Sequence, residues 1–144
     1  IDANPNPFKA RTLSCTGLKY CKFAISETKD TAIALAKHLH EKFPDFGETV
    51  SISLNGCPNS CAHSNIVDIG LLGTKFKNDD GETVPGFELS LGGNLEGVKS
   101  SFGKKTGVKF ISDDAHEIVE DLIESYIKSD YKSFHDYAVG RVNE

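Results

Sequence analysis

Apolar residues between positions 24 and 43 recur at steps of three and four, which is the spacing of one face of an α-helix. The residues of this face are Ala32, Ile33, Leu35, Ala36, Leu39 and Phe43. Pro44 follows directly, and proline does not continue a helix because it lacks a backbone N–H. The pattern therefore predicts one long amphipathic helix over residues 24–43.

Other segments alternate between apolar and polar residues, as half-buried strands do. Residues 49–54 and 87–91 follow this alternation. Residues 66–72 predict a further strand, and residues 11–14 predict a short one. Turn-forming residues at 78–81 join the two later strands as a hairpin. The short strand, the long helix and the second strand have the order of a parallel β-α-β unit.

The C-terminal part of the chain predicts two more helices. Apolar residues have helical spacing again after position 113. They are Ile118, Val119, Leu122, Ile123, Tyr126 and Ile127. Asp114 and Glu117 are spaced like a capping box, and Ser133 offers another helix start. We interpret the lysine-bearing stretch 99–109 as a solvated loop.

Together these elements predict an α+β fold. We expect a mixed or antiparallel sheet of about four strands, with the long helix packed on one face and the C-terminal helices closing the structure. Residues 1–11 contain two residue–proline steps, which are typical of an extended linker. Residues 12–144 are then a single domain. The chain has no methionine and starts at Ile1, so we expect it to be excised from a longer polypeptide.

Composition narrows the function classes. With 144 residues, of which 38% are apolar, the chain can bury a core without disulfide bonds. No apolar run approaches the roughly 20 residues of a membrane span, so we expect no membrane partner. The net charge of −5 argues against a nucleic-acid partner, because phosphate groups are contacted mainly by lysine and arginine.

The four cysteines form two close pairs, Cys15-x5-Cys21 and Cys57-x3-Cys61. Such pairs can converge on one inorganic centre. A gap of five residues is wide for zinc, whereas a 4Fe–4S cluster accepts unequal gaps. Zinc, with His63 as a possible ligand, and two disulfides stay open as alternatives. Free thiols favour a reducing cytoplasm.

We expect both cysteine pairs to lie at helix N-termini, where the helix dipole favours the thiolate. Cys21 leads directly into the helix predicted from residue 24. Pro58 follows Cys57, and proline suits the first position of a helix. Cys61 would then lie about one turn further along.

The residues around both pairs resemble a known signature. Cys15-Thr-Gly-Leu-Lys-Tyr-Cys21 and the following residues to Lys29, with Asn55-Gly-Cys-Pro-Asn-Ser-Cys61, resemble the cluster motifs of siroheme-dependent nitrite and sulfite reductases. The similarity continues through Asp68-Ile-Gly70 and Leu91-Gly-Gly-Asn94. The resemblance implies the C-terminal 4Fe–4S/siroheme domain of such an oxidoreductase.

In that family four cysteines hold the cluster and the last thiolate also binds the siroheme iron. The resemblance therefore implies Cys15, Cys21, Cys57 and Cys61 as cluster ligands, with Cys61 as the bridge to siroheme. It also implies electron transfer from the cluster to siroheme for the reduction of nitrite to ammonia or of sulfite to sulfide. Ferredoxin or another donor supplies the electrons, and the choice between nitrite and sulfite stays open.

Further cofactor-binding candidates are small residues beside these motifs. They are Thr16, Asn55, Asn59, Gly92, Gly93 and Asn94. The polar side chains can donate to sulfur or to a macrocycle carboxylate, and the glycines allow close approach of a cofactor. Arg11 and Arg141 are the only arginines, so we expect the substrate-binding basic residues in an N-terminal half of the same reductase and no catalytic residue here. The isolated chain is then inactive. A stand-alone 4Fe–4S electron-transfer module and a zinc-stabilised interaction domain are the alternative functions.

Overall fold

Five strands form one mixed sheet in the computed structural model, which describes residue 3 and residues 5–144. Their order in space is their order in the chain: β1 (Thr12–Ser14), β2 (Ile52–Asn55), β3 (Ile69–Lys77), β4 (Thr83–Leu91) and β5 (Lys104–Phe110). The first three strands run parallel, and β4 and β5 continue the sheet antiparallel. This confirms the predicted α+β class and adds a fifth strand.

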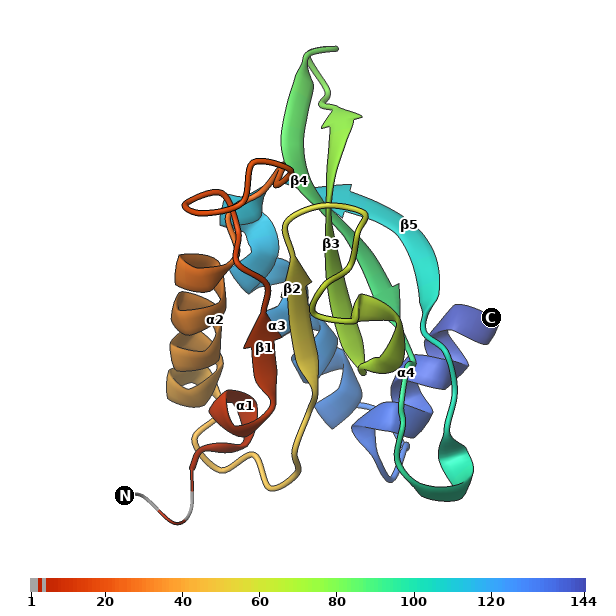
Figure 1. Ribbon diagram of the computed structural model, residues 1–144. Coiled ribbons are helices and arrows are strands. Elements are labelled where there is room, and N and C mark those ends of the chain that lie inside the picture. Colours follow the sequence, from red (N-terminus) through yellow and green to blue (C-terminus); the bar gives the residue numbers. More distant parts are fainter. Residues whose placement is uncertain (1–2, 4) are drawn as a thin grey trace.

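Four α-helices and three short 3-10 turns complete the described part of the chain. The helices are α1 (Pro7–Ala10), α2 (Lys29–Lys42), α3 (Ala115–Ile127) and α4 (Phe134–Asn143), and the turns are η1 (Ser64–Ile66), η2 (Gly97–Lys99) and η3 (Ser112–Asp114). The succession β1–α2–β2 is the predicted β-α-β unit. In Figure 1, α3 passes behind the sheet and α2 lies beside β1. None of the helices in the described residues is long and apolar enough to cross a membrane.

The hydrophobic core lies between one face of the sheet and the helices. Side chains alternate between the two faces of a strand, so Ile69 and Leu71 on β3 share the core face with Phe87 and Leu89 on β4. The helices supply Leu35, Leu39, Val119, Leu122, Ile123, Phe134 and Ala138. Each fully buried leucine or isoleucine contributes about 1.5–3 kcal/mol relative to an exposed one.

The other face of the sheet carries small and polar residues, including Gly70 on β3 and Ser90 on β4. The loop between β2 and β3 lies on this face. Ser90 Oγ donates to the carbonyl of Ser64 in that loop at 3.2 Å. An added Cβ at Gly70 would lie 2.2 Å from the same carbonyl oxygen. The small side chains therefore let the loop that carries Cys57 and Cys61 rest directly on the sheet.

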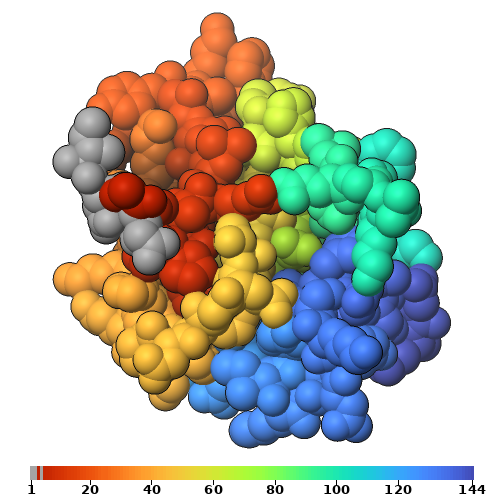
Figure 2. Space-filling model, turned by 90° about the horizontal axis from the view of Figure 1, so that it is seen from below, coloured from red at the N-terminus to blue at the C-terminus, as the bar shows by residue number. Residues whose placement is uncertain are grey.

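The packed part of the chain begins inside the segment for which a linker was predicted. Helix α1 covers Pro7–Ala10, and Asn6 Oδ1 caps it by accepting the amide of Lys9. Phe8 is fully buried and stacks on Phe46 with ring centroids 5.0 Å apart. Figure 2 shows these red N-terminal residues meeting the loop between β4 and β5, where Arg11 forms an ion pair with Glu96.

The long helix begins at Lys29 and not at residue 24, so the predicted start was wrong. Residues 24–28 leave the helix because the amides of Ile25 and Ser26 donate to the carbonyl of Gly56 at 2.6 and 3.0 Å. The carboxylate of Glu27 then accepts amides of the first helical turn, including that of Lys29. A long-range contact thus replaces one helical turn.

Two further local predictions differ from the structure, and one is confirmed. Residues 104–110 form strand β5 instead of a solvated loop. Asp114 makes no capping hydrogen bond, because the chain enters α3 through the 3-10 turn η3. Ser133 does cap α4, since its Oγ accepts the amide of Asp136 at 3.1 Å.

Candidate metal centre

The two cysteine pairs lie in loops at the same end of the sheet. Cys15 follows β1 directly, and Cys57 follows the end of β2 at Asn55. Because β1 and β2 are parallel, their carboxyl ends meet at one edge, and the loops that follow them meet there too. Figure 1 shows both loops at that end. All four thiols are free.

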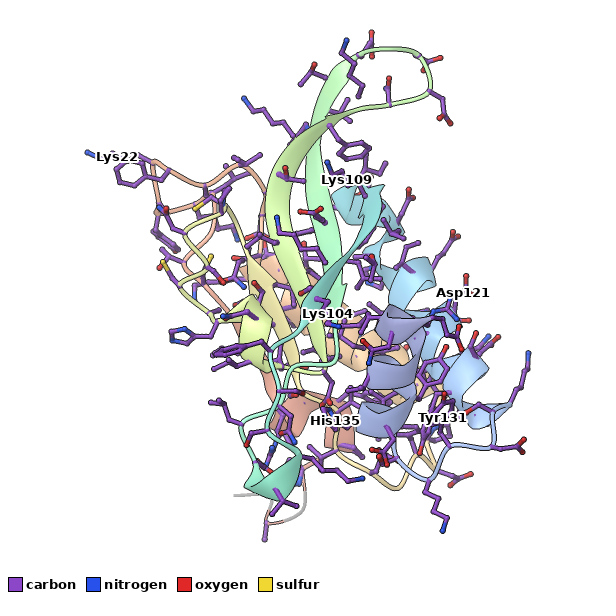
Figure 3. The ribbon with its side chains drawn as sticks, turned by 90° about the vertical axis from the view of Figure 1, so that its right-hand side faces the viewer. Lys22, Lys104, Lys109, Asp121, Tyr131 and His135 are labelled. Carbon is purple, nitrogen blue, oxygen red and sulfur yellow. The ribbon has the colours of Figure 1, made fainter. Side chains whose placement is uncertain are left out.

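Gly56 is the point at which the two loops touch. Its amide donates to the sulfur of Cys15 at 3.1 Å, and its carbonyl accepts the amides of Ile25 and Ser26, which follow Cys21. Every sulfur drawn in Figure 3 belongs to a cysteine because the chain has no methionine, and the sulfurs lie in the loops beside Lys22. The first pair is therefore held against the residue that precedes the second pair.

The first loop turns at Gly17, which has a φ of 73°. Its carbonyl accepts the amides of Tyr20 and Cys21, at 3.2 and 2.9 Å. An added Cβ at this position would lie 2.5 Å from Thr28 Oγ1. Thr28 is fully buried and donates that hydroxyl to the carbonyl of Cys15 at 2.9 Å. Glycine is required here both for the backbone conformation and for space.

Asn55, the last residue of β2, holds the second loop in place. Its Oδ1 accepts the amide of Ala62 at 2.6 Å, and its Nδ2 donates to Ser53 Oγ at 3.0 Å. Ser53 Oγ in turn donates to the carbonyl of Ala62. Asn55 is 1% exposed, so these contacts are made away from water. They hold the residue that follows Cys61 against the strand.

No helix begins at either cysteine pair, so the predicted helix N-termini were wrong. Residues 57–61 form turns, and Ser60 has a φ of 53°, which interrupts any helix started at Pro58. A loop amide, that of Gly56, donates to the sulfur of Cys15, and the hydroxyl oxygen of Thr28 lies 3.7 Å from the same sulfur.

The four cysteines differ in exposure. Cys57 is 9% exposed, Cys15 and Cys21 are half-buried, and Cys61 is exposed. Thr16 and Asn59, which neighbour the ligands in sequence, are exposed as well. Cys15, Cys21 and Cys57 are thus partly or largely buried. The thiol of Cys61, in contrast, is accessible to a group outside this domain.

The predicted candidates Gly92, Gly93 and Asn94 lie elsewhere. An added Cβ at Gly93 would lie 2.6 Å from Val67 N, and the amide of Gly93 donates to the carbonyl of Val67 at 3.0 Å. Asn94 binds the backbone of Glu96 through its side chain. These residues pack the β4–β5 loop against the end of the second cysteine loop. None of the contacts given above involves a cysteine sulfur.

Gly73 is a supporting residue that sequence reasoning did not single out. An added Cβ there would lie 2.3 Å from the carbonyl carbon and oxygen of Gly56 and 2.8 Å from the amide nitrogen of Cys57. The available signal was a glycine inside a strand pattern, which often marks close approach of another backbone.

The ligand arrangement bears on the choice of metal. Within the described part of the chain, no three histidine, cysteine, aspartate or glutamate side chains lie close enough to hold one metal ion. A zinc site requires its ligands around a single ion. A 4Fe–4S cluster binds each cysteine at a separate iron, and the four free thiols of the two adjoining loops equal that number of ligands.

Known proteins are similar in sequence to this chain over most of its length. A profile of the family described as nitrite and sulphite reductase 4Fe-4S domain matches residues 8–142. Sulfite reductase (ferredoxin) 1 of Mycolicibacterium paratuberculosis is 32% identical over 146 residues, covering 96% of this chain and 26% of that protein. Ferredoxin–nitrite reductase of Synechococcus elongatus is 39% identical over 119 residues, covering 83% and 23%. The chain spans about a quarter of the length of these relatives.

Solved structures share the fold. The Mycobacterium tuberculosis NirA protein superposes with a TM-score of 0.85 at 29% identity, over 94% of this chain and 26% of that one. Dissimilatory sulfite reductase I superposes with a TM-score of 0.58 at 14% identity, which concerns the fold alone. With two adjoining cysteine loops on this fold and a family match from residue 8 to residue 142, the chain belongs to the nitrite and sulphite reductase 4Fe-4S domain family.

Proposed function

We propose that this chain is the 4Fe–4S- and siroheme-binding domain of a cytoplasmic nitrite or sulfite reductase. In the longer enzyme it serves the reduction of nitrite to ammonia or of sulfite to sulfide. The observation that carries the proposal is the 3.1 Å contact from the amide of Gly56 to Cys15 Sγ, which puts the start of the second cysteine motif against the first. The family match over both motifs supports it.

Cys15, Cys21, Cys57 and Cys61 are the proposed ligands of the cluster. When bound, the cluster would supply electrons and the siroheme would supply the iron centre for multi-electron reduction. The protein contributes position and hydrogen bonds. Gly56 N–H donates to Cys15 Sγ, and donors to a ligand sulfur raise the reduction potential of such centres.

Cys61 is the proposed bridge to siroheme. Its exposure leaves its outer side accessible to a macrocycle, while Asn55 holds the adjoining Ala62 in place through a 2.6 Å hydrogen bond. Asn55 therefore acts as a positioning residue, since its amide is already used inside the protein. Thr16 and Asn59 are exposed beside the ligands, and we keep them as donors to sulfur or to a siroheme carboxylate. Gly92, Gly93 and Asn94 act through the loop that they pack.

Other parts of the reductase and an electron donor must supply the positive field and the electrons that the reaction needs. An anionic substrate and the siroheme carboxylates need a positive field, and Arg11 and Arg141 are the only arginines. Arg11 is already paired with Glu96. We therefore assign the substrate-binding basic residues to an N-terminal half of the reductase. The relatives' names include ferredoxin, so ferredoxin is the proposed electron donor.

Anaerobic reconstitution with iron and sulfide tests the cluster. We expect about four irons per chain and a broad visible absorbance. Cys15→Ser and Cys57→Ser should each lower the iron content severalfold, whereas Ser100→Ala, an exposed change on another loop, should leave it unchanged. Well under one cluster per wild-type chain, or stoichiometric zinc with folding lost on chelation, would overturn the proposal.

Siroheme addition separates this function from a stand-alone 4Fe–4S module. The reconstituted domain should perturb the visible bands of added siroheme, and Cys61→Ser should remove that perturbation. In an otherwise complete enzyme, Cys15→Ser should impair mainly the cluster, while Cys61→Ser impairs both centres. Unperturbed siroheme bands with a full cluster would favour the stand-alone module.

A further inference from the structure

The outer edge of β1 is an unpaired sheet edge. β1 is the first strand of the sheet and bonds only to β2. The bonds run from Ile52 N to the carbonyl of Arg11 and from Cys15 N to the carbonyl of Leu54. Because alternate residues of a strand bond to the same side, the N–H and C=O groups of Thr12 and Ser14 point away from β2.

A groove of about 500 Å³ lies along this edge, between β1 and helix α2. Small and apolar residues of α2 line it, among them the buried Ala32 and Ala36 and the exposed Ile33. Thr12 and Ser14 form one wall. A second hollow, lined by Pro44 and Phe46, shares Asn6, Lys9 and His40 with the groove. The two hollows are therefore neighbours along the same side of the molecule.

The groove is basic, although the chain as a whole carries a net charge of −5. Lys9, Lys29, Lys37 and His40 line it, and no aspartate or glutamate does. Among the described residues, the carboxylate paired with these groups is that of Glu41, at 3.9 Å from Lys37 Nζ in an exposed pair. Such a pair neutralises little charge in water. The groove therefore attracts a negatively charged group.

We propose that this groove binds an extended acidic peptide segment of a partner protein, which adds to β1 as a further strand. The free backbone groups of Thr12 and Ser14 supply main-chain hydrogen bonds, as in other strand-addition complexes. One face of the added strand packs small apolar side chains on Ala32 and Ala36. Acidic side chains near the ends of that segment, on the face turned to α2, reach Lys9 and Lys37. A helix or a single phosphate would leave the strand edge unused.

A peptide of eight residues, with two glutamates at each end and four valines between them, is the direct probe. Titrated into the 15N-labelled 144-residue chain at low salt, it should shift the amide resonances of Thr12 and Ser14 together with those of α2 residues lining the groove. Binding should weaken as salt is added. The same peptide with lysine for glutamate should not bind. Equal binding of both peptides, or shifts confined to another surface, would overturn the proposal.

Two comparisons separate strand addition from charge attraction alone. A probe with N-methyl groups along its bonding edge should lose binding, because it keeps the charges but lacks the donors. The double variant K9E/K37E should weaken the unmodified probe by about fivefold or more. K75E/K132E, with the same charge change on exposed residues outside the groove, is the matched control. Undiminished affinity of K9E/K37E, or of the methylated probe, would contradict the proposal. The test needs no cluster, so its outcome is independent of the function proposed above.

Discussion

The amide nitrogen of Gly56 lies 3.1 Å from the sulfur of Cys15, although the two residues are 41 positions apart. One residue thus joins both cysteine motifs, because the carbonyl of Gly56 also accepts the amides of Ile25 and Ser26. The relative position of the motifs therefore depends on where Gly56 sits on the sheet. Gly73 on β3 determines that position, since it leaves room for the Gly56 carbonyl.

Gly73→Ala should separate the two cysteine loops. The new Cβ would lie 2.3 Å from the Gly56 carbonyl, which is closer than such atoms pack, so the backbone of Gly56 must move. We expect a loss of about 1–3 kcal/mol in the free energy of unfolding, measured by urea denaturation. The iron content after reconstitution should fall severalfold.

Gly47→Ala is the control for that variant, because an added Cβ there meets nothing within 4 Å. It should keep both the stability and the iron content of the parent chain. Wild-type iron content in Gly73→Ala would show that the Gly56 contact is not what brings the motifs together.

Asn55→Ala should destabilise the domain even without a cluster. The change removes two buried hydrogen bonds and leaves the amide of Ala62 without its partner. A buried unsatisfied donor costs about 1–3 kcal/mol, and thermal unfolding of the apo protein measures it. Asn59→Ala is the matched comparison, because Asn59 is exposed in the same loop. Its apo stability should match the parent, and any effect should be confined to the bound cofactors. Equal apo stability of both variants would refute the positioning role of Asn55.

The sequence predicted the elements whose pattern is local and missed those set by distant contacts. Helical periodicity found α2 and α3, and alternation found β2 and part of β4, because burial of one face imposes those periods. The segment 24–28 also fits a helix locally, but its amides bond to Gly56 instead. β5 was missed because it is a lysine-bearing edge strand with mostly exposed residues.

The same division holds for the candidate site. The cysteine spacing indicated two convergent loops, and the carboxyl ends of parallel β1 and β2 bring the loops together. Thr28, Ser53 and Gly73 support those loops through contacts 9 or more residues away or through space left empty. Spacing within a motif carries no information about such partners, so they became visible only in the folded chain.

Glu120→Gln should make stability less dependent on acid pH. Hydrogen bonds from His38 at 2.5 Å and from Lys42 at 3.1 Å lower the pKa of Glu120 below its ordinary value of 4.5. A depressed pKa means that the ionised carboxylate stabilises the fold above pH 4.5, and that this contribution is lost as the pH falls through the folded-state pKa. We expect the variant to be less stable by about 1 kcal/mol near pH 6, with a gap that closes toward pH 3.

Urea denaturation across that range measures the gap. Asp121→Asn, on an exposed position in the middle of the same helix, removes the same charge without the pair and should show little change. A gap that stays constant from pH 6 to pH 3 would assign the loss to packing and not to the carboxylate.

Tyr126→Phe should lose stability at neutral pH and regain parity in strong base. Burial, and then the hydrogen bond that the hydroxyl donates to Glu48, raise the pKa of Tyr126 to about 12 from its ordinary value of 10. Glu48 also accepts the amide of Phe134 at 2.7 Å, so it ties α3 to the start of α4. Removing the hydroxyl should cost about 1 kcal/mol. Because the pKa is raised, this contribution is complete below pH 10 and is lost as the pH rises toward 12.

Denaturation at neutral pH and at several values between 10 and 12, with an absorbance titration of the phenolates, measures both effects. The titration of Tyr126→Phe should lack the group that ionises latest. Tyr20, which is 76% exposed, provides the control, since Tyr20→Phe should leave that late group and the stability unchanged. The variant keeps the ring and its contacts with Phe46 and Phe134, so the comparison isolates the hydroxyl. A stability difference that is the same at pH 7 and pH 11.5 would show that the protonated hydroxyl and its bond to Glu48 are not the source of the loss.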